Sequence, residues 1–134
     1  MMIGKIRQYL ITNKIIDENC RINVDFLGEE PTEFAITPIP INPVLENYID
    51  GSKLMQYQFQ LISCNDYGSD VTQNIENSTF YENLYELITK NNTEGIFPDI
   101  KGIQTIECID NGAILNEMTN TARYAIQMRI IYYR

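Results

Sequence analysis

Apolar and polar side chains alternate along residues 53–64, and this pattern constrains the fold more than any other feature of the chain. The apolar positions are Met55, Tyr57, Phe59 and Leu61, and glutamines fill the positions between them. Such a period of two is typical of a β-strand, because successive side chains of a strand point to opposite faces of its sheet. One face of this segment is therefore expected to pack against apolar groups, while the other meets water or a polar partner.

A second long alternating stretch lies at the C-terminal end of the sequence and is the best candidate to pair with the first. Its apolar positions are Ala122, Tyr124, Ile126, Met128, Ile130 and Tyr132. Near its end, Ile131 and Tyr133 add apolar side chains to the opposite face. We therefore expect both faces of this strand end to be covered, either by a helix or by another subunit.

The rest of the pattern predicts a single α+β domain over residues 1–134. Helical spacing of apolar residues predicts helices over residues 2–12 and 70–90, and poor helix formers leave room for a break near residue 78. Further strands are expected over residues 22–26, 33–37, 44–49 and 103–109. Because strands and helices do not alternate regularly, we expect an antiparallel sheet of about five strands flanked by the two helices, in the order helix, strands, helix, strands. The second helix should lie across the apolar face of the first strand described.

Three short segments are predicted to be hairpin turns. Residues 28–32 would join the strands on either side of them, and the dipeptides Asp50-Gly51 and Asn111-Gly112 are strong two-residue hairpin signals. Prolines at positions 38, 40 and 43 remove backbone donors, so this part of the chain is expected at a sheet edge or on the surface.

Charge and apolar run length limit the function classes. The formal net charge is −8, the acidic residues are spread along the chain, and Lys and Arg form no cluster. A protein that grips duplex DNA presents a basic patch, so tight nucleic-acid binding is not expected. No apolar run reaches the roughly 18 residues of a membrane-spanning helix, and no signal-peptide pattern is present, so neither membrane insertion nor secretion is expected.

Catalytic and metal-binding residue patterns are weak throughout. Cys20, Cys64 and Cys108 lack CxxC spacing, and the chain has no histidine, so reduced structural thiols are expected and neither a metal site nor a cofactor is predicted. The segment 66–77 has Asn where a calcium loop has its final glutamate. The turn acids Glu29 and Glu30, with Glu33 nearby, are the closest approach to a carboxylate active site, but a solvated acidic loop is the simpler interpretation.

Tyrosine is abundant, with nine residues in 134. Its ring is apolar and its hydroxyl is polar, which suits both cores and interfaces. Core positions are expected for Tyr57 and Tyr124. Interface positions are expected for Tyr48, Tyr67, Tyr132 and Tyr133.

Six pieces of the sequence, in the same order, resemble a known protein family over nearly the whole chain. They are Gly28-Glu29-Glu30-Pro31-Thr32, Tyr48-Ile49-Asp50-Gly51-Ser52, Gln56-Tyr57-Gln58-Phe59, Tyr67-Gly68-Ser69-Asp70, Gln73-Asn74-Ile75-Glu76-Asn77-Ser78 with Phe80-Tyr81-Glu82, and Thr121-Ala122-Arg123-Tyr124 with Ile126. In these pieces the chain is similar to the minor capsid or tail-terminator proteins of phages, prophages and phage-tail-like particles of Gram-positive bacteria. Residues 112–120 fit the likeness least well.

The resemblance implies a structural, non-enzymatic subunit that is assembled in the bacterial cytoplasm and resides at the head-proximal end of a tail. Six copies would form a ring that caps the tail tube, stops its polymerisation and joins it to the head connector. Expected partners are further copies of the chain, the tail tube protein and the head–tail connector protein, with the sheath protein as a further candidate. Two alternatives stay open: a head-side neck protein and a small cytoplasmic enzyme that uses the acids at 29, 30 and 33.

Candidate interface residues come from exposed turns and from the apolar strand end, because recognition is commonly carried by loops and hairpin tips. They are Glu29, Glu30, Tyr48, Asp50, Tyr67, Ile131, Tyr132 and Tyr133. The acidic turn after Gly28 or the hairpin at residues 48–52 is expected to dock on the tube end.

Overall fold

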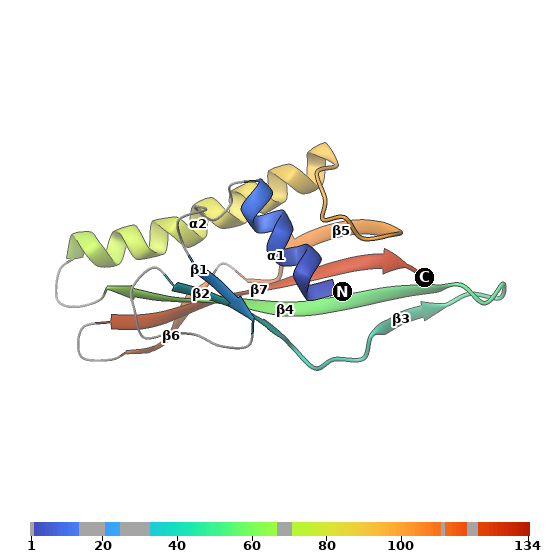
Figure 1. Cartoon of the computed structure of the whole chain (residues 1–134), viewed down its shortest axis with the longest axis horizontal. Coiled ribbons are helices and arrows are strands. Elements are labelled where there is room, and N and C mark those ends of the chain that lie inside the picture. The colour runs from blue at the N-terminus through green and yellow to red at the C-terminus, as the bar shows by residue number, and fades with distance from the viewer. Residues whose placement is uncertain (1, 14–20, 25–32, 67–70, 111, 118–120) are drawn as a thin grey trace.

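The computed structural model describes residues 2–13, 21–24, 33–66, 71–110, 112–117 and 121–134. Two helices, α1 (Met2–Thr12) and α2 (Val71–Glu94), lie on the same face of a seven-stranded sheet (Figure 1). The strands are β1 (Arg21–Val24), β2 (Glu33–Pro38), β3 (Val44–Asn47), β4 (Lys53–Asp66), β5 (Ile103–Cys108), β6 (Ala113–Glu117) and β7 (Thr121–Tyr133). The predicted α+β class and element order are confirmed.

The two alternating stretches found in the sequence form the centre of the sheet. β4 and β7 pair antiparallel from Leu54 opposite Tyr133 to Asp66 opposite Thr121. The main strand order is β1-β2-β4-β7-β5, which matches the expected five strands, while β3 extends the β2 edge of β4 and β6 extends the β5 edge of β7. This long pairing fixes the register between β4 and β7, so residues that are far apart in the sequence lie opposite one another.

Two of the three predicted hairpins are wrong. β1 and β2 run parallel, so they do not form the predicted hairpin, since only antiparallel strands can be joined by a tight turn. Residues 28–32 themselves lie outside the described residues. β5 and β6 both pair with β7, and they follow one another along the same edge, so Asn111-Gly112 does not join a hairpin. Gly112, with φ of +83°, instead donates its N–H to the Asp110 carboxylate at 2.9 Å.

Helix α2 has no break near residue 78 and continues to Glu94, beyond the predicted end at 90. Its last turn contains asparagines that disfavour helix, but tertiary hydrogen bonds compensate. The Asn91 side chain donates to the Tyr9 hydroxyl at 3.0 Å, and the Asn92 side chain accepts from the Ile106 N–H at 3.1 Å. These contacts tie the end of α2 to α1 and to β5.

The core lies between the sheet and the two helices. The largest fully buried side chains are Ile6, Leu10, Ile36, Phe59, Leu61, Tyr81, Leu84, Ile88, Ile106, Ile126 and Met128. Tyr124 is buried as predicted, and Tyr57 packs against the same cluster although it is only half-buried. α2 packs over this face, in agreement with the expectation that the second helix lies across the apolar side of the central strand.

The opposite face of the sheet is polar. Gln56, Gln58 and Gln60 alternate with the buried residues of β4 and are half-exposed. The Gln58 side chain donates to the Gln127 side-chain oxygen at 3.0 Å, and Arg129 forms an ion pair with Glu107 on β5. The glutamine positions of the sequence pattern therefore form a hydrogen-bonded polar surface, and neither α1 nor α2 covers it (Figure 1).

Candidate functional site

The β3–β4 hairpin extends beyond the end of β7 (Figure 1). Its turn closes with two backbone hydrogen bonds, from the Tyr48 N–H to the Ser52 carbonyl at 3.0 Å and from the Gly51 N–H to the Tyr48 carbonyl at 3.1 Å. The Asp50 carboxylate accepts from both the N–H and the hydroxyl of Ser52, at 3.0 and 2.6 Å, and Gly51 has φ of +90°. The Asp50-Gly51 hairpin predicted from the sequence is confirmed.

Large apolar side chains are exposed on this hairpin. Ile49 is fully exposed, at 108% of its reference area, and Leu45 and Tyr48 are each 39% exposed. The Tyr48 ring lies near that of Tyr133 on β7, with 6.2 Å between ring centroids. Single exposed apolar residues are ordinary, but several on one projecting turn make it a candidate interaction surface. We call Leu45, Glu46, Tyr48, Ile49 and Asp50 the hairpin tip.

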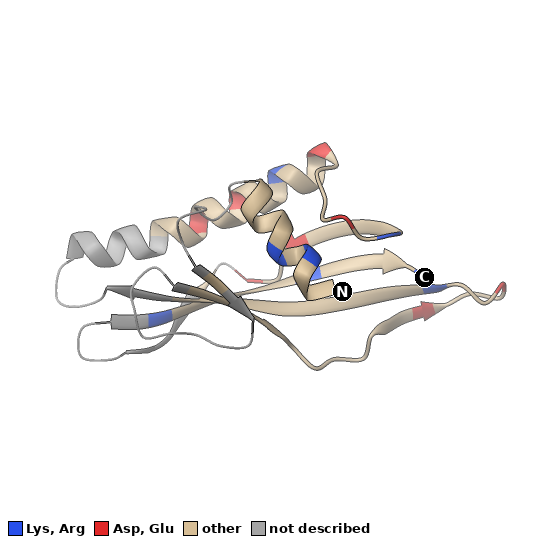
Figure 2. Ribbon diagram, in the orientation of Figure 1, with Lys and Arg blue, Asp and Glu red and all other residues tan. Residues whose placement is uncertain are grey.

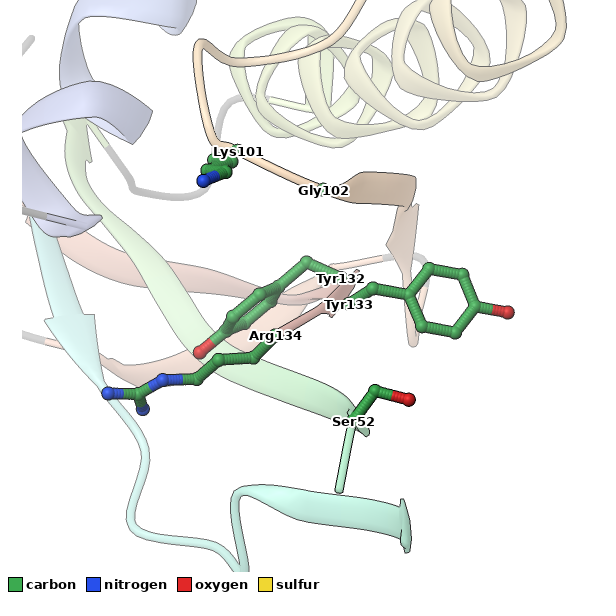
Figure 3. A pocket seen from close by; sticks show the side chains of 6 residues that line it. All are labelled: Ser52, Lys101, Gly102, Tyr132, Tyr133 and Arg134. Atoms are coloured by element: carbon green, nitrogen blue, oxygen red, sulfur yellow. The ribbon is translucent and has the colours of Figure 1, made fainter. Parts of the chain in front are cut away.

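A groove lies beside the base of this hairpin, at the same end of the sheet. It has a volume of about 620 Å³ and is lined by Ser52, Lys101, Gly102, Tyr132, Tyr133 and Arg134; we call it the end groove. Figure 3 shows Tyr132 and Arg134 extending to one side and Tyr133 to the other, with Lys101 across from them on the loop before β5. Tyr132 and Tyr133 are neighbours on β7, so their rings lie on opposite sides of the strand.

Gly102 holds the Lys101 loop against the end of β7. Its carbonyl accepts from the Tyr133 N–H at 2.9 Å, and its φ of +77° suits glycine. A Cβ atom at this position would lie 2.4 Å from the Tyr133 carbonyl oxygen. Only glycine therefore allows the close approach that sets this wall of the end groove.

The hairpin tip and the end groove carry charges of opposite sign. Glu46 and Asp50 place two carboxylates on the tip, whereas Lys101 and Arg134 place two cations on the groove (Figures 2 and 3). Within the described ranges the one ion pair is Arg129 with Glu107, so neither groove cation is neutralised by a neighbouring carboxylate.

The ionisation states of the tip are well defined near neutral pH. The Tyr48 hydroxyl donates to the Glu46 carboxylate at 3.0 Å, and this bond to a negative group is the main cause that raises the pKa of Tyr48 to about 12. Hydrogen bonds from Ser52 lower the pKa of Asp50 below its usual value. Tyr48 is therefore neutral and Asp50 is ionised.

The structure brings together four of the residues proposed from sequence: Tyr48, Asp50, Tyr132 and Tyr133. Ile131 lies nearby, opposite Gln56 on the polar face, and is half-exposed. Of the two predicted covers for the second face of this strand end, the helix is wrong because both helices lie on the other face. Cover by another subunit stays a prediction. Glu29, Glu30 and Tyr67 lie outside the described residues.

Sequence reasoning placed Ile49 within the predicted docking hairpin at residues 48–52 without singling it out, and it missed Lys101, Gly102 and Arg134 as parts of this site. Ile49 was detectable, because a large apolar residue directly before an Asp-Gly turn has no reason to be there in an isolated hairpin. Lys101 and Gly102 carried no such signal, since only the pairing of β5 with β7 places them beside Arg134.

The described residues offer little support for catalytic chemistry. No three described His, Cys, Asp or Glu residues cluster as metal ligands would. Burial is the main cause that raises the pKa of Cys108 to about 12, so this thiol stays protonated and is a poor nucleophile. Neither described helix is long and apolar enough to span a membrane.

No protein-family model matches the chain, and a search of curated proteins returns no match either. Function therefore has to be inferred from the residues and their geometry.

Proposed function

We propose that this protein is a structural subunit that acts by binding other copies of itself and neighbouring proteins. The observation that carries the proposal is the hairpin tip, where Ile49 is fully exposed and Leu45 and Tyr48 are partly exposed on a projecting turn. Exposing these side chains to water is unfavourable in proportion to their apolar area, so a partner that covers them gains that free energy.

More particularly, we propose a tail-terminator protein of a phage or phage-tail-like particle. Six copies would form a ring at the head-proximal end of the tail tube, stop tube polymerisation and join the tube to the head connector. Support comes from the six sequence pieces that resemble this family and from the α+β architecture with helices flanking an antiparallel sheet, which is the architecture that the resemblance implies. The tail tube protein and the head–tail connector protein are the proposed partners, with the sheath protein as a further candidate.

Tail length tests this function directly. The gene would be deleted from the phage or prophage that carries it, the particles purified, and the tails measured by electron microscopy. We expect tubes of uncontrolled length without heads attached, and normal tails when the wild-type gene is supplied on a plasmid. Tails of normal length in the deletion strain would contradict the proposed function.

A further inference from the structure

We infer that the hairpin tip of one copy binds in the end groove of the next copy. The inference rests on the proposed function, because it names the contact by which copies of the chain would associate. The occupant of the groove is a second copy of this chain, and the argument for it comes from apolar fit, charge and connectivity.

Apolar surfaces are present on both sides of the proposed contact. The tip offers the fully exposed Ile49 side chain, and the groove is lined by Tyr132 and Tyr133, whose rings leave β7 on opposite sides (Figure 3). Tyr133 is 45% exposed, so its ring has free area to cover. Aromatic residues that line a pocket at an interface and receive an apolar anchor are typical of the residues that carry most of the binding free energy.

Charge complementarity lets the tip of one copy meet the groove of another copy in a single contact. The tip carries the carboxylates of Glu46 and Asp50, and the groove carries the cations of Lys101 and Arg134. Copies with a formal charge of −8 repel one another at long range, and a local contact between opposite charges offsets part of that repulsion. Such a contact also fixes which surface of one copy meets which surface of the next.

The connectivity makes the contact intermolecular and head-to-tail. β3 stays paired with β4 up to Asn47 opposite Lys53, so the tip projects away from the sheet and would have to break these pairs to fold back onto Lys101. Tip and groove adjoin where Tyr48 lies near Tyr133, but Ile49 on the tip and Lys101 on the groove belong to separate surfaces, and each copy has one of each. Repetition of such a contact gives a closed ring, or an open filament where the rotation does not close.

Variants of the two surfaces test the contact by sedimentation velocity. Ile49→Asp alters only the tip, and the double variant Lys101→Glu with Arg134→Glu alters only the groove. Each is expected to weaken association at least about tenfold, as loss of a central interface residue does. Leu87→Asp is the matched control, because Leu87 is 38% exposed on α2 and belongs neither to the tip nor to the lining of the groove, so it should leave association unchanged.

Mixing the two variants distinguishes a head-to-tail contact from a symmetric one. A copy with Ile49→Asp keeps an intact groove, and a copy with the double charge reversal keeps an intact tip, so the mixture can form one productive contact. We expect heterodimers that do not grow further. A mixture that remains monomeric, or an Ile49→Asp variant that associates like the wild type, would overturn the inference.

Circular dichroism tests folding and tail length tests function, each independently of the contact between copies. Ile49 is fully exposed, so its variant should keep the far-UV circular dichroism spectrum of the wild type, and a changed spectrum would overturn the assignment of Ile49 to a free tip. Tails of controlled length made with Ile49→Asp would overturn the contact and leave the terminator function standing. A protein that associates through tip and groove without controlling tail length would contradict the function and leave the contact standing.

Discussion

At the level of single residues, Tyr81 forms a buried polar contact between α2 and the centre of the sheet. Its side chain is 2% exposed, its ring stacks on that of Tyr124 with 5.9 Å between centroids, and its hydroxyl forms a hydrogen bond with the Ser63 hydroxyl. Tyr81→Phe removes this hydroxyl, so we expect the free energy of unfolding to fall by about 1–2 kcal/mol. Urea denaturation measures the change, and Tyr85→Phe, on an exposed position of the same helix, should change it by less than about 0.5 kcal/mol.

The same residue predicts how stability depends on alkaline pH. Burial raises the pKa of Tyr81 above its usual value of 10.0, so above pH 10 the unfolded chain loses a proton that the folded chain keeps. Stability from this group is fully present below pH 10 and is lost as the pH rises further. The wild type should therefore lose more stability than Tyr81→Phe between pH 9 and about 11. Parallel pH curves for the two proteins would show that Tyr81 does not contribute in this way.

At the scale of elements, the loop before β5 depends on Gly102. Gly102→Ala would place a methyl group 2.4 Å from the Tyr133 carbonyl oxygen at a φ of +77°. We expect a loss of at least about 1 kcal/mol, measured by thermal unfolding. Gly4→Ala in α1 meets nothing within 4 Å and should raise stability by up to about 1 kcal/mol, so the two substitutions should have effects of opposite sign. If Gly102→Ala left the stability unchanged, Gly102 would not hold this wall of the end groove as described.

The sequence predicted which face of each central strand is buried, but it did not predict which strands pair with one another. Alternation in β4 and β7 revealed which side of each strand is buried, and Asp50-Gly51 revealed one hairpin, because both signals are local. The parallel pairing of β1 with β2 and the end-to-end placement of β5 and β6 have no local signal, since a strand's own pattern does not state its partner or direction. For the same reason Tyr48 and Tyr133 could be proposed as interface residues, but not as neighbours of Lys101.

At the scale of the whole molecule, the acid excess predicts little affinity for duplex DNA. The chain carries a formal charge of −8, and Arg129, a residue that could contribute to a basic surface with Arg123 and Arg134, is paired with Glu107. Fluorescence anisotropy at physiological salt should therefore show no binding to a labelled duplex. Micromolar binding that weakens steeply with salt would contradict this prediction and point to those arginines as a DNA-contacting surface.

The most direct test of the account is the mass of the wild-type protein in solution. The single chain has a mass of 15.6 kDa, and self-association through the hairpin tip and the end groove predicts a discrete larger species. Six copies would give about 94 kDa, which is six times the chain mass. Sedimentation velocity over a range of concentrations should show this species for the wild type and a monomer for Ile49→Asp. A wild-type protein that stays monomeric up to about 1 mM, the limit of very weak association, would contradict the account.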